Sequence, residues 1–416
     1  MRYKDEDLIT AIDIGSDKVV VAISEIDDTG SINVIGIGKS GSKNGIKQGV
    51  IVNIESVVSA LTEAVEQAEI QAGREISSVC VGISSANIET INSKGIVAIS
   101  GVDKEIREND INRVIEAGKA VAIPMDREIL HIIPQAFTVD GQRGIKYPIG
   151  MVGTRLECQI HILTCAISSI QNVMKSMDRA GLIVRNLVLQ NLAAAKSLLT
   201  EDEKELGVLL IDIGAETAKV SVYYEQAPYY NAIFPLGGYL ITGDLSQALK
   251  ISYANAEKIK EAYGVADFEY VEDDETIQIP SIGGREPKYL ARKNLVHIIR
   301  PRVEEIFSII KNDLIEKGYF DKISGGIVLT GGSTIMPGMA EVCQEVFDLQ
   351  TRVGGLRRFA GLGDEISGPE YSVINGLLLW GIEDFNKNND FLGKPKREES
   401  GKNVFQKIKD MFGELF

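Results

Sequence analysis

The sequence predicts an α/β protein of two duplicated lobes, with an inserted α+β subdomain and a C-terminal amphipathic helix. The duplication is indicated by two segments, each with an apolar strand, the tripeptide Asp-Ile-Gly and a second apolar strand. The first is centred on Asp13 and the second on Asp212, about 200 residues further along. The insertion is indicated by a change of pattern between residues 84 and 164, and the terminal helix by an apolar stripe that follows a polar segment.

Composition sets the broad class. The chain has 416 residues, of which 44% are hydrophobic and 25% charged, and a net charge of −15. This length is enough for two or more domains. The negative charge argues against nucleic-acid binding, which needs a basic surface. No apolar run reaches the roughly 18 residues of a membrane span and no signal peptide is visible, so we expect the body to stay in the cytosol.

The first lobe begins with an expected strand meander over residues 9–12, 19–26 and 32–37. A helix should follow, capped by Asn53 and ending near Gly73, because its apolar residues recur at helical spacing. In the insertion we expect a strand pair from residues 88–91 and 96–99, and a helix capped by Asp110.

The second lobe should contain the second Asp-Ile-Gly unit and a largely helical region over residues 236–318. It should end with a strand that runs into Thr330-Gly-Gly-Ser333 and a helix that begins at Pro337, with the proline in its first turn. After Trp380 the sequence turns polar, which predicts a flexible linker.

The two Asp-Ile-Gly turns and the paired glycines after Thr330 predict a nucleotide site. Glycine allows backbone to approach a ligand closely, and successive N–H groups can face a phosphate. Asp13 and Asp212 lie where hydrated Mg²⁺ would bridge protein and phosphate. The sequence has no Gly-x-x-x-x-Gly-Lys-Ser/Thr motif, so we expect the phosphates to be bound by a different kind of loop from the P-loop.

This three-part pattern resembles the actin-like ATPase superfamily, which implies duplicated ribonuclease-H-like domains with ATP and Mg²⁺ between two lobes. The residues that the resemblance assigns to the nucleotide are, for the first phosphate loop, Asp13, Gly15, Ser16 and Lys18; for the second, Asp212, Gly214 and Thr217; and for adenosine, Gly331, Gly332 and Ser333. Lys18 has the alternative of a solvated strand residue.

Two features qualify the expected chemistry. Glu216 puts a carboxylate near the phosphates, which is unfavourable unless it points away or shares the metal. Gln190, at the end of a predicted strand, is the candidate for positioning a hydrolytic water, with a purely structural role as the alternative. We therefore expect at most a slow ATPase, for which ATP binding matters more than turnover.

The last residues form an amphipathic stripe. At 100° per residue, the apolar side chains fall within one arc of roughly 140°. These residues are Val404, Phe405, Ile408, Met411, Phe412, Leu415 and Phe416. A helix docked on the protein's own body is the alternative, but the polar linker favours an in-plane membrane helix. One copy would bind weakly and many copies on a polymer strongly.

The insertion together with this tail resembles the FtsA family of bacterial actin homologues, as do the segments 12–19, 45–52, 148–157, 199–207 and 281–285. The resemblance implies a peripheral protein at the division septum, on the cytoplasmic face of the inner membrane. It implies polymerisation, recruitment of the FtsZ C-terminal tail by the small subdomain of the second lobe, and contacts of the insertion with other division proteins. Basic candidates for the FtsZ contact are Arg285, Lys293, Arg300 and Arg302, with solvated helix faces as the alternative.

The expected domains, in chain order, are as follows: 1–84, first lobe; 85–165, inserted α+β subdomain; 166–200, first lobe resumed; 201–235, second lobe; 236–318, its small subdomain; 319–383, second lobe resumed; 384–401, linker; 402–416, membrane-targeting helix. Competing interpretations are a soluble kinase or ATPase of the actin-like fold and a pilus-assembly actin homologue. A kinase has no use for a lipid-binding helix, and the amphipathic tail also counts against the pilus protein.

Overall fold

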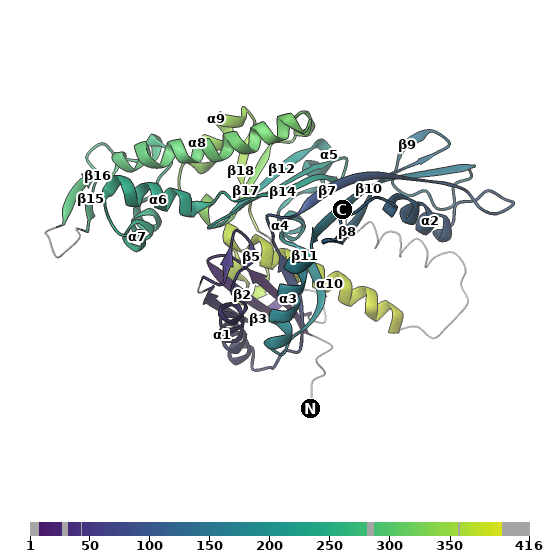
Figure 1. Ribbon diagram of the computed structural model, residues 1–416, viewed down its shortest axis with the longest axis horizontal. Coiled ribbons are helices and arrows are strands. Elements are labelled where there is room, and N and C mark those ends of the chain that lie inside the picture. The colour runs from purple at the N-terminus through teal and green to yellow at the C-terminus, as the bar shows by residue number, and fades with distance from the viewer. Residues whose placement is uncertain (1–7, 27–31, 43, 281–286, 357, 393–416) are drawn as a thin grey trace.

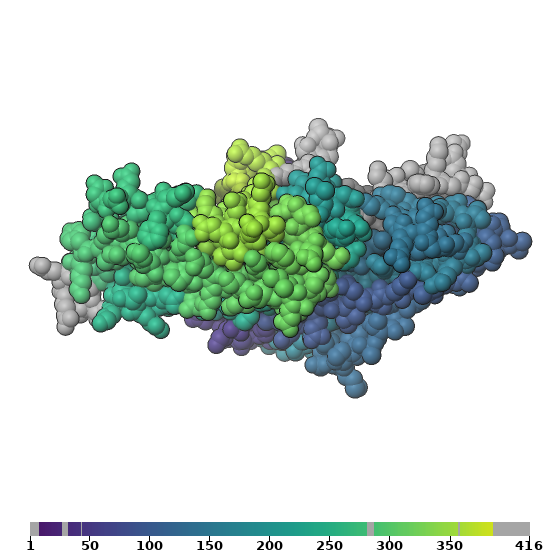
Figure 2. Space-filling view, turned by 90° about the horizontal axis from the view of Figure 1, so that it is seen from above, coloured from purple at the N-terminus to yellow at the C-terminus, as the bar shows by residue number. Residues whose placement is uncertain are grey.

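The computed structural model describes residues 8–26, 32–42, 44–280, 287–356 and 358–392. Three main sheets each have their own apolar core. Figure 1 shows the first lobe below the second, with the inserted subdomain extending to the right. In the space-filling view of Figure 2 the molecule is elongated, with the insertion and the helices of the second lobe at opposite ends. The predicted tail helix and Arg285 lie outside the described residues.

The first lobe is built on a six-stranded sheet of order β11-β6-β1-β2-β3-β19. Its strands are β1 (Leu8–Ile14), β2 (Lys18–Ile26), β3 (Ile32–Gly41), β6 (Ser78–Ile83), β11 (Ile183–Leu189) and β19 (Ala360–Gly361). A short hairpin, β4 (Ile46–Lys47) and β5 (Val50–Ile51), leads to helix α1 (Ile54–Ala72). The predicted meander and helix are confirmed: Asn53 caps α1 by accepting a hydrogen bond from the backbone N–H of Ser56, and Gly73 ends it.

The inserted subdomain is an antiparallel sheet of order β7-β10-β8-β9 covered by helix α2 (Glu108–Lys119). Its strands are β7 (Glu89–Ala98), β8 (Arg127–Val139), β9 (Gln142–Ile145) and β10 (Arg155–Ala166). The expected strand pair at 88–99 is wrong, because this segment is one strand that pairs along its whole length with β10. The expected cap at Asp110 is also wrong, because the N-cap is Arg107. Asp110 is the third residue of the helix, and its carboxylate accepts a hydrogen bond from the backbone N–H of Arg107.

The second lobe repeats the topology of the first around a five-stranded sheet of order β14-β13-β12-β17-β18. Its strands are β12 (Val208–Ile213), β13 (Ala218–Tyr224), β14 (Ala227–Phe234), β17 (Ile327–Thr330) and β18 (Thr351–Val353). In both lobes an antiparallel hairpin, β1–β2 or β12–β13, pairs in parallel with a third strand, β6 or β17. This shared pattern confirms the duplicated two-lobed fold.

The remaining elements of the second lobe are mostly helical, as predicted. They are α6 (Gly238–Leu249), α7 (Tyr253–Tyr263), η2 (Phe268–Tyr270), β15 (Thr276–Ile279), β16 (Lys288–Ala291), α8 (Lys293–Glu316), η3 (Phe320–Lys322), η4 (Gly332–Ile335) and α9 (Met339–Phe347). The helix expected from Pro337 is α9, but it begins at Met339 with Gly338 as its N-cap, so the proline lies just outside it. None of the helices in the described ranges is long and apolar enough to cross a bilayer.

Four more helices and two short 3₁₀ helices complete the described fold. They are α3 (Ile167–Arg179), α4 (Gln190–Leu198), α5 (Glu201–Leu206), η5 (Leu362–Ile366), η6 (Pro369–Tyr371) and α10 (Ser372–Leu392). α10 packs closely on α4, since a Cβ at Gly376 would lie 1.8 Å from the carbonyl oxygen of Ala193. α10 runs to Leu392, so the first part of the predicted linker, 384–392, is helical. Adding residues to an existing helix is favourable even where the sequence is polar.

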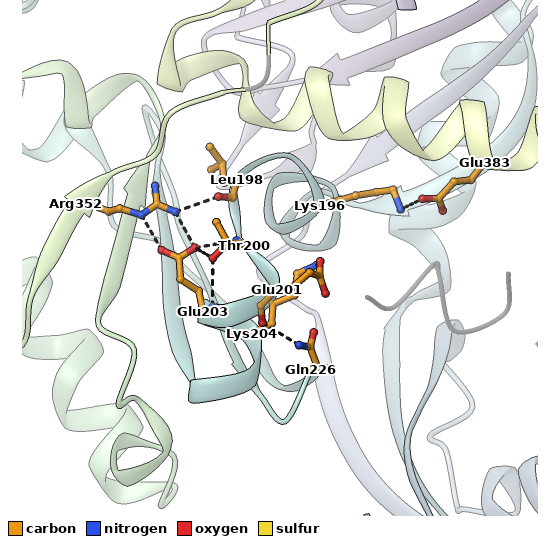
Figure 3. Close-up of polar contacts among 9 residues, drawn as sticks. All are labelled: Lys196, Leu198, Thr200, Glu201, Glu203, Lys204, Gln226, Arg352 and Glu383. Atoms are coloured by element: carbon orange, nitrogen blue, oxygen red, sulfur yellow. Dashed lines mark hydrogen bonds and ion pairs between the residues drawn. The ribbon is translucent and has the colours of Figure 1, made fainter. Parts of the chain in front are cut away.

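Ion pairs fix the passage from the first lobe to the second, as Figure 3 shows. Thr200 and Glu203 form a capping box at the start of α5. Arg352 on β18 donates to both carboxylate oxygens of Glu203, at 2.7 and 2.8 Å, and to the carbonyl oxygen of Leu198 at 3.1 Å. Burial raises the pKa of Glu203, but the hydrogen bonds from Arg352 and Thr200 outweigh it and hold the pKa below its usual value.

Candidate functional site

The two Asp-Ile-Gly segments form matching turns. In the first, the backbone N–H of Gly15 donates to the carbonyl oxygen of Lys18 at 2.9 Å, and in the second Gly214 donates to Thr217 at 2.9 Å. Each turn joins the two strands of its hairpin, so both aspartates lie at the end of a buried central strand. The two Asp-Ile-Gly segments therefore share the same backbone turn as well as the same sequence.

The third predicted turn meets the second one. β17 runs parallel to β12 and pairs Thr330 with Asp212. At Gly331 the φ angle is +95°, and a Cβ there would lie 2.3 Å from a carboxylate oxygen of Asp212, so only glycine fits. The hydroxyl of Ser333 donates to the carbonyl oxygen of Gly214 at 3.0 Å.

One cavity of about 450 Å³ lies between the lobes and is lined by every residue that the sequence assigned to the nucleotide. These are Asp13, Gly15, Ser16, Lys18, Asp212, Gly214, Thr217, Gly331, Gly332 and Ser333, together with Gln190. Segments more than 300 residues apart in the chain thus meet at one site, since Asp13 and Ser333 both face it. The volume lies in the range of small-molecule pockets.

Sequence reasoning missed several polar lining residues, among them Lys219, Tyr239, Glu257, Lys260 and Glu370. Most lie on helices of the second lobe, where single polar residues give no signal. Lys219 is the exception, because the hairpin register that pairs Ile213 with Ala218 also places Lys219 opposite Asp212. A charged residue in an otherwise apolar strand was the available signal.

Asp13 is the most perturbed acid of the cavity. Burial, and to a smaller extent the nearby Asp212, raise the pKa of Asp13, Lys219 and Lys18 oppose the rise, and the net result is a pKa of about 6. The side-chain amide of Gln190 donates to Asp13 Oδ1 at 2.8 Å and to the carbonyl oxygen of Ile14 at 3.2 Å. Lys18 also lies over the ring of Tyr371, with its ammonium 4.4 Å from the ring centroid.

The role of Asp13 and Asp212 in holding hydrated Mg²⁺ stays a prediction, and in the structure both carboxylates already have polar partners. Asp212 Oδ2 already accepts a hydrogen bond from the Lys219 ammonium at 2.7 Å, and Asp13 accepts one from Gln190. No group of three or more metal-ligating side chains occurs in the described part of the chain. A cation bound directly by both aspartates would have to displace Lys219.

Two hydrogen bonds join the lobes at or beside the cavity. The phenol of Tyr239 donates to Asp17 Oδ1 at 3.0 Å, and the backbone N–H of Gln48 donates to Glu216 Oε2 at 2.5 Å. Glu216 therefore points across to the first lobe. The Glu216 carboxylate is thus bound by a backbone N–H of the other lobe, as expected if it points away from the site predicted for the phosphates.

The predicted FtsZ-contacting residues are only partly brought together. Lys293, Arg300 and Arg302 all lie on α8, whereas Arg285 is outside the described residues. Arg300 pairs with Asp267, Glu304 and Glu345, and Arg302 pairs with Asp244 and Glu305. Both guanidinium groups are thus neutralised by acids of the same lobe. The predicted membrane-binding residues, Val404 to Phe416, also lie outside the described residues.

Comparison with known proteins places this architecture in a family. The family model for the SHS2 domain inserted in FtsA matches residues 85–164, and the model for cell division protein FtsA matches residues 209–376. The FtsA of Borreliella burgdorferi is 40% identical over 408 residues, covering 97% of this chain and 98% of its own length. The FtsA of Pseudomonas aeruginosa is 42% identical over 376 residues, covering 90% and 89%.

Solved structures of low sequence identity share the fold. The PilM-PilN type IV pilus biogenesis complex aligns over 91% of this chain and 98% of its own, with a TM-score of 0.64 and 15% identity. The MreB5 protein of Spiroplasma citri bound to ADP aligns over 94% and 100%, with a TM-score of 0.55 and 14% identity. Taken with the duplicated lobes and the insertion, these matches show that the chain belongs to the FtsA family of cell division proteins and has the actin-like fold.

Proposed function

We propose that this chain binds ATP in the cavity between its lobes and assembles into actin-like filaments on the inner face of the cytoplasmic membrane. There it would tether the FtsZ ring at the division septum. The observation that carries the proposal is the single cavity lined by glycine turns of both lobes. The same fold in an MreB5 protein has been solved bound to ADP and bound to AMPPNP, which supports a nucleotide as the ligand.

The cavity suggests a division of roles. The first turn, with Ser16 and Lys18, and the second, with Thr217, would hold the phosphates, and the Gly331–Ser333 segment would face the adenosine. The amide nitrogen of Gln190 is committed to Asp13 and Ile14, so only its side-chain oxygen can orient an attacking water. This arrangement supports slow turnover at most.

The tail supplies the membrane contact in this proposal. Its apolar stripe, from Val404 to Phe416, would lie in the plane of the lipid surface, and the linker would hold the acidic body away from anionic headgroups. Filament assembly would bring many tails together, which converts weak single contacts into stable attachment.

The partner contacts follow the proposed domain boundaries. The small subdomain at 236–318 would receive the FtsZ tail, with Arg285 and Lys293 as its basic contacts. Arg300 and Arg302 could join only by sharing their acidic partners. The insertion at 85–165 would contact neighbouring subunits and other division proteins. A second cavity of about 310 Å³, between α2 and β8 of the insertion and Trp380, supports a contact there.

Liposome flotation with Mg-ATP tests the membrane part of the proposal. The full chain is compared with a chain ending at Gly401, which lacks only the amphipathic stripe. We expect the full chain to float and the shortened chain to stay in solution. Flotation of neither would contradict the proposal.

A matched pair of substitutions tests the orientation of the stripe. Phe412→Glu adds a negative charge on the apolar arc, and Gln406→Glu adds the same charge on the polar face. Phe412→Glu should abolish flotation, and Gln406→Glu should retain most of it. Equal loss in both would indicate a charge effect and no oriented helix.

A further inference from the structure

We propose that Lys219 is a phosphate-binding residue that supplies the positive charge assigned to Mg²⁺ from the sequence, so that this chain binds ATP with little dependence on a divalent cation. The inference rests on the proposed nucleotide function of the same cavity. It concerns how the phosphates are held, and therefore makes a separate prediction.

The geometry places the Lys219 ammonium against one of the two carboxylates predicted to hold Mg²⁺. Its Nζ lies 2.7 Å from Asp212 Oδ2, and the two side chains are only 11% and 6% exposed. Both residues line the cavity. An ammonium group has three N–H donors, and the bond to Asp212 uses one of them. The others are available to an anionic ligand in the cavity.

The first lobe shows what is special about this residue. The two hairpins are equivalent, and the cross-strand partner of Asp13 on β2 is Val20, whereas that of Asp212 on β13 is Lys219. Val20 is buried and apolar. Duplication of the lobe therefore accounts for the aspartate but not for the lysine, which is an added charge on one side of the cavity.

The charges that line the cavity explain why a lysine at position 219 would favour an anionic ligand. Asp13 and Asp212 both line the cavity in which the phosphates are expected, and two carboxylates would repel a polyphosphate there. Lys18 and Lys219 together offset these two charges. A divalent cation held at Asp212 would instead stand next to the Lys219 ammonium, and like charges at that distance repel strongly.

The experiment measures ATP binding to the full chain by isothermal titration calorimetry, with excess MgCl₂ and with EDTA. We expect the dissociation constant of the unaltered protein to change by less than about threefold between the two conditions, since the charge-assisted hydrogen bond from Lys219 is present in both. An affinity that falls by more than about tenfold in EDTA would overturn the inference and leave the proposed nucleotide function standing. Absence of ATP binding in both conditions would overturn the proposed function, and the inference with it.

Two variants separate a phosphate contact from a structural ion pair. Lys219→Met should weaken binding in EDTA about tenfold to hundredfold, the range of one charge-assisted hydrogen bond, and added MgCl₂ should restore part of the loss. Lys258→Met, on the exposed face of α7, is the matched control and should bind as the unaltered protein does.

Removing the lysine alone leaves Asp212 unpaired and could impair folding. The double variant Asp212→Asn with Lys219→Met removes both charges, and it should show the same loss in EDTA. Binding of ATP in EDTA by this folded double variant at unaltered affinity would mean that Lys219 serves only to neutralise Asp212, and the inference would be wrong.

Discussion

The phenol hydroxyl of Tyr239, in the second lobe, donates a hydrogen bond to Asp17 Oδ1, in the turn after the first Asp-Ile-Gly, at 3.0 Å. Burial raises the pKa of Tyr239, and the Asp17 carboxylate adds to the rise. Both residues line the cavity between the lobes. The bond therefore joins the lobes at the mouth of the cavity, and it must break if the cavity opens widely.

Tyr239→Phe should speed the release of a bound nucleotide by about three- to tenfold, because it removes one hydrogen bond to a partly exposed charged group. The rate can be followed by stopped-flow displacement of a fluorescent ATP analogue. The control is Tyr270→Phe, which removes a similar bond to Glu341 within the second lobe. Equal effects of the two substitutions would show that the bond between the lobes does not limit release.

Arg352→Ala should lower the free energy of unfolding by about 1–3 kcal/mol, because it leaves the partly buried Glu203 without its bidentate partner. Chemical denaturation at pH 7 measures the change. Arg179→Ala breaks an exposed pair with Glu55 and should cost less than about 1 kcal/mol. A cost for Arg352→Ala no larger than that of the control would contradict the prediction.

His161 should make the protein sensitive to acid. It lies at the contact between the insertion and β14, between the side chains of Asn92 and Asn231 at 2.7 and 3.0 Å, and burial lowers its pKa from 6.5 to about 3. Between these pH values the unfolded state binds more protons, so stability should rise with pH from about 3 to 6.5 and then level off.

The variant His161→Gln keeps one donor and one acceptor but cannot titrate, so its melting temperature should depend less on pH across that window. Thermal denaturation at several pH values measures the difference. The exposed His297→Gln is the control and should leave the pH profile unchanged. A profile for His161→Gln parallel to that of the unaltered protein would rule out this histidine as the source.

Asp13 should have the opposite effect on stability. Its folded-state pKa of about 6 lies above the ordinary 3.8, so the folded state binds more protons between these values and stability should fall as pH rises through them. Asp13→Asn should therefore raise the free energy of unfolding at pH 8 by up to about 3 kcal/mol. Denaturation of this variant, beside the exposed control Asp321→Asn, tests the sign; a loss of stability would contradict it.

The sequence predicted the parts of the site that depend on local structure. The turns at Gly15 and Gly214 follow from an apolar strand, a glycine and a second strand, and each turn closes on itself within four residues. Gly331 follows from the same kind of signal. Local rules also found the cap at Asn53, because its side chain accepts its hydrogen bond from the first turn of its own helix.

What the sequence could not predict depends on partners distant in the chain. The continuity of β7 is set by its pairing with β10, more than 50 residues later. Likewise, Arg300 and Arg302 looked like free basic residues, but their partners Asp267 and Asp244 are 33 and 58 residues away. Such pairs form only when the tertiary fold brings the elements together.

The backbone of Gly376 packs directly on that of Ala193, so we expect helices α10 and α4 to move together. At one end, Ser372 of α10 lines the cavity, and α4 begins at Gln190, which holds Asp13. At the other end lies Leu392, about 30 Å away along a helix of 21 residues. A tilt of about 10° at the cavity would move the far end by about 5 Å, as follows from the length of such a helix. The far end of α10 would therefore move whenever the lining of the cavity between the lobes changes its tilt.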